Sequence, residues 1–312
     1  MGTKLPTFFI VGAAKAGTTS IADYLNTHPQ VYISPIKEPH YFSKDIRCEN
    51  FEEKYRKLVC FDQDDYFAKE PLEQKHAAFI QKQEHYEQLF NDMQADQIGG
   101  EGSVGYLYSQ EAPREIYKQV PKAKIIIILR NPIGRAFSHW LMDLRMGIVH
   151  EGGFLQAIEA DVHAPKKGWG NQHLYIELGL YFQQVKRYFD TFGRDNVKVI
   201  LFDDLKVSNA KVMEDITQFL GLETFEYDLE GKKNPAKLPK FPLLHSTIRK
   251  LGLIDLGNAI IPKIFLEKLK ASIYTNKNLP KLTSEDRVAL QKYFKEDIVN
   301  LSELINRDLT AW

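Results

Sequence analysis

The chain has few cysteines, no surplus of charge of either sign and no long apolar run. Cys48 and Cys60 are the only two cysteines among 312 residues, too few for a disulfide framework. We interpret them as free thiols, and a bridge between them is the alternative if the protein is exported. Lys and Arg number 41 and so do Asp and Glu, so no global field indicates a nucleic-acid partner. Any anion site must therefore be local.

No stretch approaches the ~20 apolar residues of a membrane span, and the apolar run near the N-terminus is too short for the core of a signal peptide. We therefore expect a cytoplasmic protein without a membrane span. With 44% hydrophobic residues the chain can bury a large core, and we expect one domain over residues 1–312. Residues 231–281 differ in composition, because they hold 11 Lys or Arg against 2 acids. This basic segment could be a helical cap over a site, touch a membrane surface or a partner, or form an ordinary solvated face.

The most informative motif is FFIVGAAKAGTTSIADY, residues 8–24. Gly12 and Gly17 have the spacing of the two glycines in G-x-x-x-x-G-K-[ST], the loop whose backbone N–H groups hold nucleotide phosphates. Thr18, however, takes the place of the lysine, and Lys15 lies inside the loop. The motif thus predicts a phosphate-binding loop for a nucleotide other than ATP.

The apolar residues before this loop predict a strand, and the pattern after it predicts a helix from about Gly17 to Leu25. The unpaired N–H groups at the start of such a helix attract an anion, and the hydroxyls that follow Gly17 add donors. An ordinary strand, turn and helix is the alternative. The lysine and the run of hydroxyls count against it.

Further apolar runs at residues 124–129 and 197–202 predict two more strands. Helical patterns fall at residues 114–120, 133–145, 153–161 and 180–192. Because strands alternate with helices, we expect an α/β fold: a P-loop-like three-layer architecture with a central, mostly parallel sheet and helices on both faces. Ligands of such sheets bind beyond the carboxyl ends of the strands.

The run KIIIIL ends in Arg130, and the helix after it brings Ser138. A planar cation and a hydroxyl here would lie near the place where the first loop holds its anion, so a second phosphate could bind there. A structural salt bridge is the alternative for Arg130. A triphosphate enzyme would instead have an aspartate at this point to order Mg²⁺, so the arginine argues against metal-assisted chemistry.

Four motifs in order, GAAKAGTTSIADYLNTHP, KEPHYF, GEGSVGYLYS and PKAKIIIILRNPIGRAFSHW, resemble those of sulfotransferases that use 3′-phosphoadenosine 5′-phosphosulfate (PAPS). The similarity is to the branch that contains bacterial members and the heparan sulfate enzymes. It continues through LTSEDRVALQKYFKEDIVNLSELINRDLTAW to the closing tryptophan, so it spans nearly the whole chain.

The resemblance implies a set of cofactor-binding residues. The loop around the 5′-phosphosulfate would consist of Lys15, Ala16, Gly17, Thr18, Thr19 and Ser20. Lys15 matches the position that steadies the bridging oxygen as charge develops there, and Arg130 and Ser138 match the pair that holds the 3′-phosphate. A late loop closes over the adenosine in the family, and Lys277 falls at that place in a segment that matches poorly.

A base must take the proton of the acceptor, and Glu38 and His40 in KEPHYF are the candidates. The heparan sulfate enzymes have a catalytic glutamate in a similar context, so Glu38 is the preferred base and His40 the second. A surface ion pair of Glu38 with Lys37 or a nearby arginine is the alternative.

One departure concerns Gly102, where relatives often have a lysine near the transferring sulfonate. Its contribution must be absent or come from elsewhere, for example from Lys237, Lys240 or Lys277. For the aromatic residues Tyr106, Tyr108, Trp169 and Tyr181 core packing is the default. His173 is interpreted as structural, with a place in the acceptor pocket as the alternative.

Taken together, the residues and the resemblance predict a PAPS-dependent sulfotransferase. It would move a sulfonate to an acceptor hydroxyl of a glycan, lipid or small molecule, or less readily to an amine, and need no metal. The alternatives are a P-loop kinase or other triphosphate enzyme and a catalytically inactive PAPS-binding module.

Overall fold

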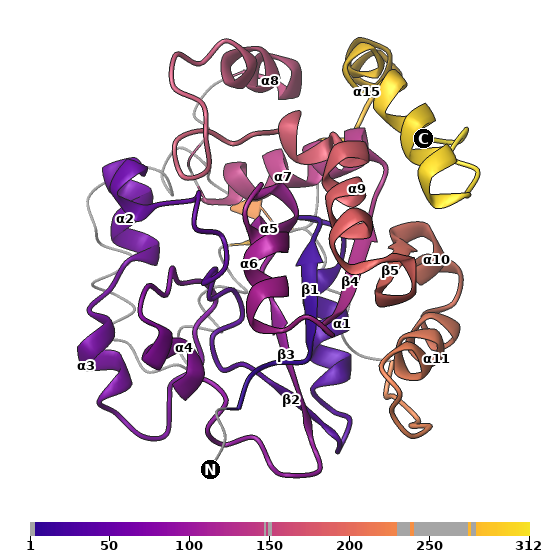
Figure 1. Ribbon diagram of the computed structural model, residues 1–312. Coiled ribbons are helices and arrows are strands. Elements are labelled where there is room, and N and C mark those ends of the chain that lie inside the picture. The colour runs from indigo at the N-terminus through magenta and orange to yellow at the C-terminus, as the bar shows by residue number, and fades with distance from the viewer. Residues whose placement is uncertain (1–3, 147, 149–151, 230–237, 240–273, 276–278) are drawn as a thin grey trace.

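The computed structural model describes residues 4–146, 148, 152–229, 238–239, 274–275 and 279–312. At its centre lies a five-stranded sheet in which every neighbouring pair of strands is parallel (Figure 1). From one edge to the other the strands are β2 (Val31–Ile33), β3 (Ile98–Gly102), β1 (Phe8–Gly12), β4 (Lys124–Leu129) and β5 (Val197–Leu201). Since all five run in the same direction, their carboxyl ends meet at one edge of the sheet.

The predicted strands agree closely with the observed ones, but two strands of this sheet were not predicted. β4 has the predicted bounds, and β5 ends one residue early because Phe202 begins α10 (Phe202–Val207). β2 has only three residues, and β3 reads IGGEG, without the β-branched run that signals a strand. Glycine is needed in β3 because a Cβ at Gly100 would lie 2.1 Å from the ring of Phe8.

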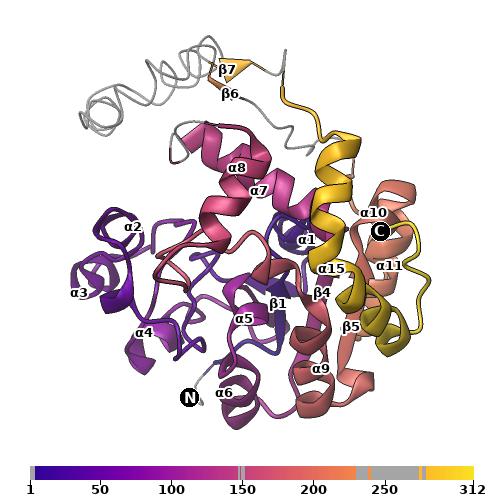
Figure 2. The same ribbon diagram turned by 90° about the horizontal axis from the view of Figure 1, so that it is seen from above.

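Helices cover both faces of the sheet, as Figure 2 shows from above. On one face lie α5 (Gly105–Tyr108), α6 (Ala112–Gln119) and α9 (Tyr181–Phe192), and on the other lies α1 (Thr18–Leu25). Among the described residues, the other α-helices are α2 (Glu53–Val59), α3 (Gln63–Phe67), α4 (Gln83–Gln88), α7 (Pro132–Met146), α8 (Phe154–Val162), α11 (Asn209–Phe219) and α15 (Ser284–Ile305). The five predicted helices correspond to α1, α6, α7, α8 and α9. The predicted three-layer α/β fold class is confirmed.

The C-terminal segment returns to the edge of the sheet where β4 ends. α15 packs along α9, and its Asp297 accepts hydrogen bonds from the first N–H groups of α9, at 2.7 Å from Tyr181 N and 3.1 Å from Phe182 N. The carbonyl of Trp312 accepts a hydrogen bond of 2.9 Å from the side chain of Asn131, directly after β4. Residues far apart in the chain therefore brace the turn that follows β4.

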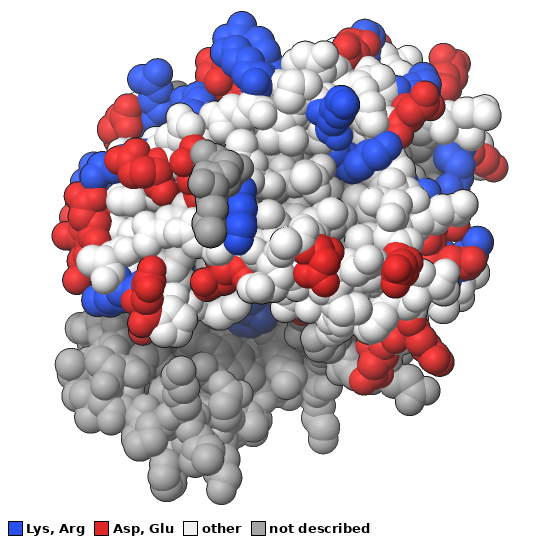
Figure 3. Space-filling model, turned by 60° about the horizontal axis from the view of Figure 1, so that its bottom comes forward, with Lys and Arg blue, Asp and Glu red and all other residues white. Residues whose placement is uncertain are grey.

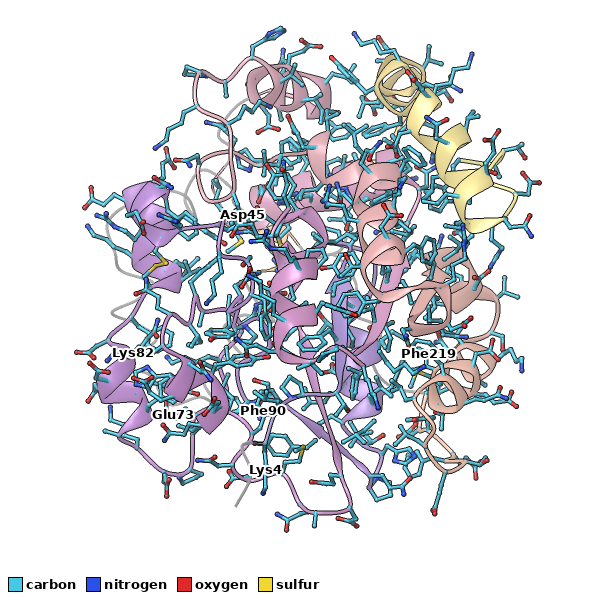
Figure 4. The ribbon with its side chains drawn as sticks, viewed as in Figure 1. Lys4, Asp45, Glu73, Lys82, Phe90 and Phe219 are labelled. Carbon is cyan, nitrogen blue, oxygen red and sulfur yellow. A yellow bond between two sulfur atoms is a disulfide. The ribbon has the colours of Figure 1, made fainter. Side chains whose placement is uncertain are left out.

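The two cysteines correct one prediction, because the structure joins Cys48 and Cys60 in a disulfide rather than leaving them as free thiols. The bridge connects a short 3-10 helix (Cys48–Asn50) to the end of α2 and appears as a yellow bond in Figure 4. Beside it, Ile46, Phe51, Val59 and Phe79 form a small buried cluster. The bridge thus ties down the region beside the sheet that contains α2.

The described surface carries charges of both signs. On the face shown in Figure 3, blue and red side chains are interspersed around a broad uncharged area. No described helix is long and apolar enough to cross a membrane. The predicted basic segment lies outside the described residues except for 238–239, 274–275 and 279–281, and the interpretation of the chain as one domain stays a prediction.

Candidate active site

The loop after β1 brings open backbone donors to the carboxyl edge of the sheet. α1 begins at Thr18, and Gly17 before it has a φ of 95° and makes no side-chain cap. The first N–H groups of α1 therefore have neither intrahelical partners nor a capping side chain. Gly12 is needed for close packing, because a Cβ there would lie 2.8 Å from Cβ of Leu107. The local geometry is that of the predicted anion-binding loop.

Lys15 lies inside this loop with a backbone conformation that lysine rarely adopts. Its φ is 67°, in the left-handed region, which costs about 1–3 kcal/mol and is found mostly at functional sites. The Nζ atom lies 3.3 Å from Sδ of Met142 on α7. Burial and then the charge of Arg145 lower the pKa of Lys15 to about 8, although Asp143 acts in the opposite direction. The ammonium is thus partly desolvated and surrounded mainly by other cations.

Arg130 follows β4 and meets the same loop across the sheet. Its Nη1 donates a hydrogen bond of 3.1 Å to the carbonyl of Lys15, and its guanidinium carbon lies 4.8 Å from the centre of the Phe202 ring. The carbonyl of Arg130 accepts a hydrogen bond from Tyr181 on α9, at 2.9 Å. Ser138 lies half-buried two turns into α7, the helix that follows Arg130. The structure thus brings Arg130 against the first loop, as the pattern predicted.

Glu38 is buried, and its two carboxylate oxygens face Lys37 and His40. Lys37 Nζ lies 2.6 Å from Oε1, and His40 Nε2 lies 3.5 Å from Oε2. Burial by itself would raise the pKa of Glu38, but the hydrogen bond from His40 and the charge of Lys37 lower it to about 2. The ion pair with Lys37 does exist, but it is largely withdrawn from solvent rather than on the surface. At neutral pH Glu38 is an ionised carboxylate with one face toward an imidazole.

His40 is held firmly by its neighbours. Its φ is 50°, and its ring stacks on Phe79 with centroids 4.5 Å apart and lies edge-on to Trp169 at 5.6 Å. A Cβ at Gly105 would lie 2.7 Å from Cε1 of His40, so this glycine makes room for the ring. Nδ1 has no hydrogen-bond partner among the described residues. A cavity of about 350 Å³ opens beside the ring, lined by residues of 40–49 and 79–81.

Lys15 and Glu38 approach the same region from different elements. The charges of Lys37, Glu38 and Lys15 all act on the imidazole of His76, and partial desolvation and the two lysines lower its pKa. The charge of Lys37 also acts on Lys15. The loop after β1 and the segment containing Lys37 and Glu38 are therefore close enough for their charges to interact.

A second buried cluster lies on the other side of Lys15, centred on Asp143. This carboxylate accepts hydrogen bonds from Tyr175 OH at 2.7 Å and pairs with Nδ1 of His173 at 2.9 Å. Burial alone would lower the pKa of His173, but the bond to Asp143 raises it. His173 is thus a partnered histidine, as interpreted. Asp143 follows Met142, which touches Lys15, so its charge reaches the predicted site.

Several residues of the site escaped sequence reasoning. Asp143 and His76 stand in no motif that marks them, and only the fold brings them to the loop. Glu101 stands in the recognised GEGSVG motif and is buried in β3, where burial raises its pKa to about 7 against hydrogen bonds from Ser103 and Tyr86. The sequence signal that could have marked Glu101 as part of the site is its position next to Gly102 in this motif.

The structure describes some of the other residues named in the sequence analysis and leaves the proposed replacement lysines undescribed. Tyr106 and Tyr181 are fully buried, which confirms core packing for these two. At Gly102 a Cβ would meet nothing closer than 3.8 Å, so a larger residue fits there. Lys237, Lys240 and Lys277 lie outside the described residues.

A family model described as "Sulfotransferase domain" matches residues 5–232. Among curated proteins, the chain is 28% identical over 321 residues to the bifunctional heparan sulfate N-deacetylase/N-sulfotransferase 4 of Mus musculus. It is 26% identical over 319 residues to the bifunctional heparan sulfate N-deacetylase/N-sulfotransferase 3 of Homo sapiens. Each match covers 99% of this chain and 31% of the relative, so the chain spans about a third of the relatives' length. The crystal structure of a sulfotransferase from Alicyclobacillus acidocaldarius is 29% identical, with a TM-score of 0.69 and coverage of 99% of this chain and 98% of that one.

Proposed function

Because the chain belongs to the sulfotransferase domain family, we propose that it moves a sulfonate from PAPS to an acceptor hydroxyl by in-line displacement. The observation that carries the proposal is the contact between Arg130 and the carbonyl of Lys15. The buried carboxylate of Glu38 supports it, because Glu38 pairs with Lys37, whose charge acts on Lys15. Lys15 in the loop after β1 and Arg130 after β4 are two cationic groups on different elements, which suits a donor with two separated phosphate groups. A chain of three phosphates would lie along one loop.

The donor would lie across the carboxyl edge of the sheet. Its 5′-phosphosulfate is assigned to the loop of residues 15–20, where the first N–H groups of α1 are open. Lys15 would steady the bridging oxygen as the S–O bond to phosphate breaks, and Arg130 and Ser138 would hold the 3′-phosphate. Lys277 is proposed for the adenosine side on its position in the sequence alone.

Glu38 would serve as the base. The acceptor oxygen forms a bond to sulfur, its proton passes to the Glu38 carboxylate, and adenosine 3′,5′-bisphosphate leaves with the electrons of the broken S–O bond. A hydroxyl becomes strongly acidic once its oxygen bonds to sulfur, so a carboxylate of low pKa can still accept the proton. His40 pairs with the second oxygen of Glu38 and is the alternative base. The cavity beside His40 offers the acceptor a way in.

For the acceptor, the names of the curated relatives support a glycan. They also support the predicted alternative of an amine acceptor, because the relatives are named heparan sulfate N-sulfotransferases. A lipid or small-molecule acceptor stays a prediction from the sequence. The panel of acceptors in the experiment must therefore include hydroxyl and amine compounds of each class.

The test incubates the protein with PAPS and a panel of glycan, lipid, phenol, alcohol and amine acceptors, and follows release of adenosine 3′,5′-bisphosphate. We expect turnover with at least one acceptor, unchanged by a metal chelator. ATP with Mg²⁺ forms the second arm. Binding and turnover of ATP without binding of PAPS would overturn the proposal, and PAPS binding without turnover would favour the inactive module.

Variants separate the proposed roles. Lys15→Ala and Glu38→Gln should each lower kcat by about 10²–10³-fold, because both would act on groups whose charge changes in the transition state. Arg130→Ala should mainly raise the KM for PAPS, since it would hold a phosphate that does not react. Wild-type turnover in Glu38→Gln would move the role of base to His40 or elsewhere.

A further inference from the structure

A buried carboxylate behind the site, Glu101, collects hydroxyl groups from three parts of the chain. Glu101 stands on β3 and is 1% exposed. Its Oε1 accepts a hydrogen bond of 2.6 Å from Ser103, and Oε2 accepts one from Tyr86 on α4. The hydroxyl of Tyr106 on α5 is close enough to interact electrostatically with this carboxylate. No described cation pairs with Glu101, so these hydroxyls alone solvate it.

Two of the three hydroxyls continue to the loop of residues 37–42, KEPHYF. Oγ of Ser103 accepts a hydrogen bond of 3.1 Å from the backbone N–H of His40, and the hydroxyl of Tyr106 accepts one of 3.1 Å from the backbone N–H of Phe42. A hydroxyl that donates its hydrogen to a carboxylate turns its lone pairs outward. Glu101 therefore sets the direction of the Ser103 hydroxyl, and hydrogen bonds in such chains strengthen one another.

The loop needs these hydrogen bonds at His40, where its backbone has an unfavourable conformation. His40 has a φ of 50°, a conformation that a non-glycine residue keeps only when its surroundings impose it. Its N–H is fixed by Ser103, and its carbonyl accepts a hydrogen bond of 2.8 Å from Ser43. Glu38 stands two residues before His40 and pairs with its ring. A change in the His40 backbone would therefore move the carboxylate that we assign as base.

We propose that Glu101 is a positioning residue for the sulfonate transfer, acting through Ser103 and Tyr106 on the loop that carries Glu38 and His40. The inference rests on the proposed function for its effect on turnover. It does not require Glu101 to touch the donor or the acceptor. Lys15 and Arg130 belong to other elements, so the donor site should be little affected.

The main test is Glu101→Gln assayed at pH 8, above the pKa of about 7 of Glu101, where this group is mostly ionised. The variant keeps the shape of the side chain but reverses one hydrogen bond, because an amide nitrogen donates where the carboxylate accepted. With PAPS and an acceptor that is turned over, kcat should fall about 10–100-fold while the KM for PAPS stays within about threefold. Ser103→Ala should show the same split between kcat and KM. As a control, Thr217→Val removes a buried hydroxyl from α11, and it should lower the melting temperature without this effect on kcat.

A double-mutant cycle tests whether Glu101 acts through Ser103. The Glu101→Gln/Ser103→Ala protein should lose little more kcat than the worse single variant, because both changes break one chain of contacts. Losses that multiply would contradict this route. A kcat within twofold of wild type in Glu101→Gln would overturn the proposal. It would also be overturned if Glu101→Gln and Thr217→Val lowered the melting temperature equally and lowered kcat equally.

Hydrogen–deuterium exchange keeps the inference apart from the proposed function, since it needs no turnover. In Glu101→Gln the amides of His40 and Phe42 should exchange faster than in the wild type, while those of β4 stay unchanged. If the wild type does not use PAPS but this local loss of protection appears, the proposed function fails and the positioning role stands. Unchanged protection at both amides would refute the positioning role itself.

Discussion

Lys15 gives the sharpest prediction, because the structure ties its charge to neighbours that can be changed separately. Burial and the charge of Arg145 lower its pKa to about 8 in the free protein. Binding of the anionic donor requires the protonated amine, so kcat/KM for PAPS should be constant below pH 8 and fall as the pH rises through this value. At pH 9 only about a tenth of the protein would hold the proton, which predicts a decline of about tenfold from pH 7.

The assay measures initial rates of adenosine 3′,5′-bisphosphate release at low PAPS concentration between pH 6 and pH 10. The Lys15→Arg protein serves as the matched control, because a guanidinium stays protonated throughout this range. Its activity should be lower, but the decline above pH 8 should disappear. A decline that persists in Lys15→Arg would show that another group titrates and would refute the assignment.

Two neighbours should move the inflection in opposite directions. Asp143→Asn removes the negative charge that raises the pKa of Lys15, so the decline should begin at a lower pH. Arg145→Gln removes a positive charge that lowers this pKa, so the decline should begin at a higher pH. Because Arg145 is exposed, its effect should shrink as salt is added. Shifts in the same direction in both variants would contradict the electrostatic reasoning.

Three further predictions concern the framework of the site. Gly102→Ala should change the free energy of unfolding by less than about 0.5 kcal/mol and leave turnover nearly unchanged. Gly105→Ala should lower turnover strongly, because its Cβ would meet the ring of His40. Equal turnover rates and equal urea midpoints in the two variants would contradict this. Asp297→Ala should cost about 1–3 kcal/mol by urea unfolding, since two N–H groups of α9 lose their acceptor, and a neutral result would refute that role. The unreduced protein should weigh two hydrogens less than the reduced one, and alkylation of both cysteines without reductant would show that they do not pair.

Sequence patterns predicted the parts of the fold whose residues carry strong local preferences. The apolar run of β4 and the helical patterns of α7 and α9 are long and regular, and their observed bounds lie within one residue of the predicted ones. The two glycines of the first loop predicted its turn in the same way. Strand β3 was missed because tertiary packing, and not local strand preference, requires its glycines. Gly100 faces the ring of Phe8, and no local sequence pattern reveals this contact.

The site was predictable where a motif marks the residue and not where the fold alone brings it in. Lys15, Glu38 and Arg130 stand in motifs, and the structure places all three around one edge of the sheet. Asp143 and His76 carry no such signal, and each reaches the site from an element that the sequence does not relate to it. The disulfide was missed for a similar reason, because the distance between two cysteines in space does not follow from their number.

The pKa shifts around the site point to a local surplus of positive charge in a chain whose net charge is zero. Burial pushes acids and bases in opposite directions, since it raises the pKa of a carboxylic acid and lowers that of an ammonium. Yet the pKa of Glu38 falls to about 2 and that of Lys15 to about 8. The hydrogen bond from His40 and the charge of Lys37 lower the pKa of Glu38 against its burial. For Lys15 burial is the largest cause, and the charges of Arg145, Arg130 and Lys37 add to it. Burial and the charges of Lys37 and Lys15 also lower the pKa of His76. Three cations, Arg145, Arg130 and Lys37, act on Lys15 against one carboxylate, Asp143, and this local surplus of positive charge is the electrostatic condition for binding an anionic donor.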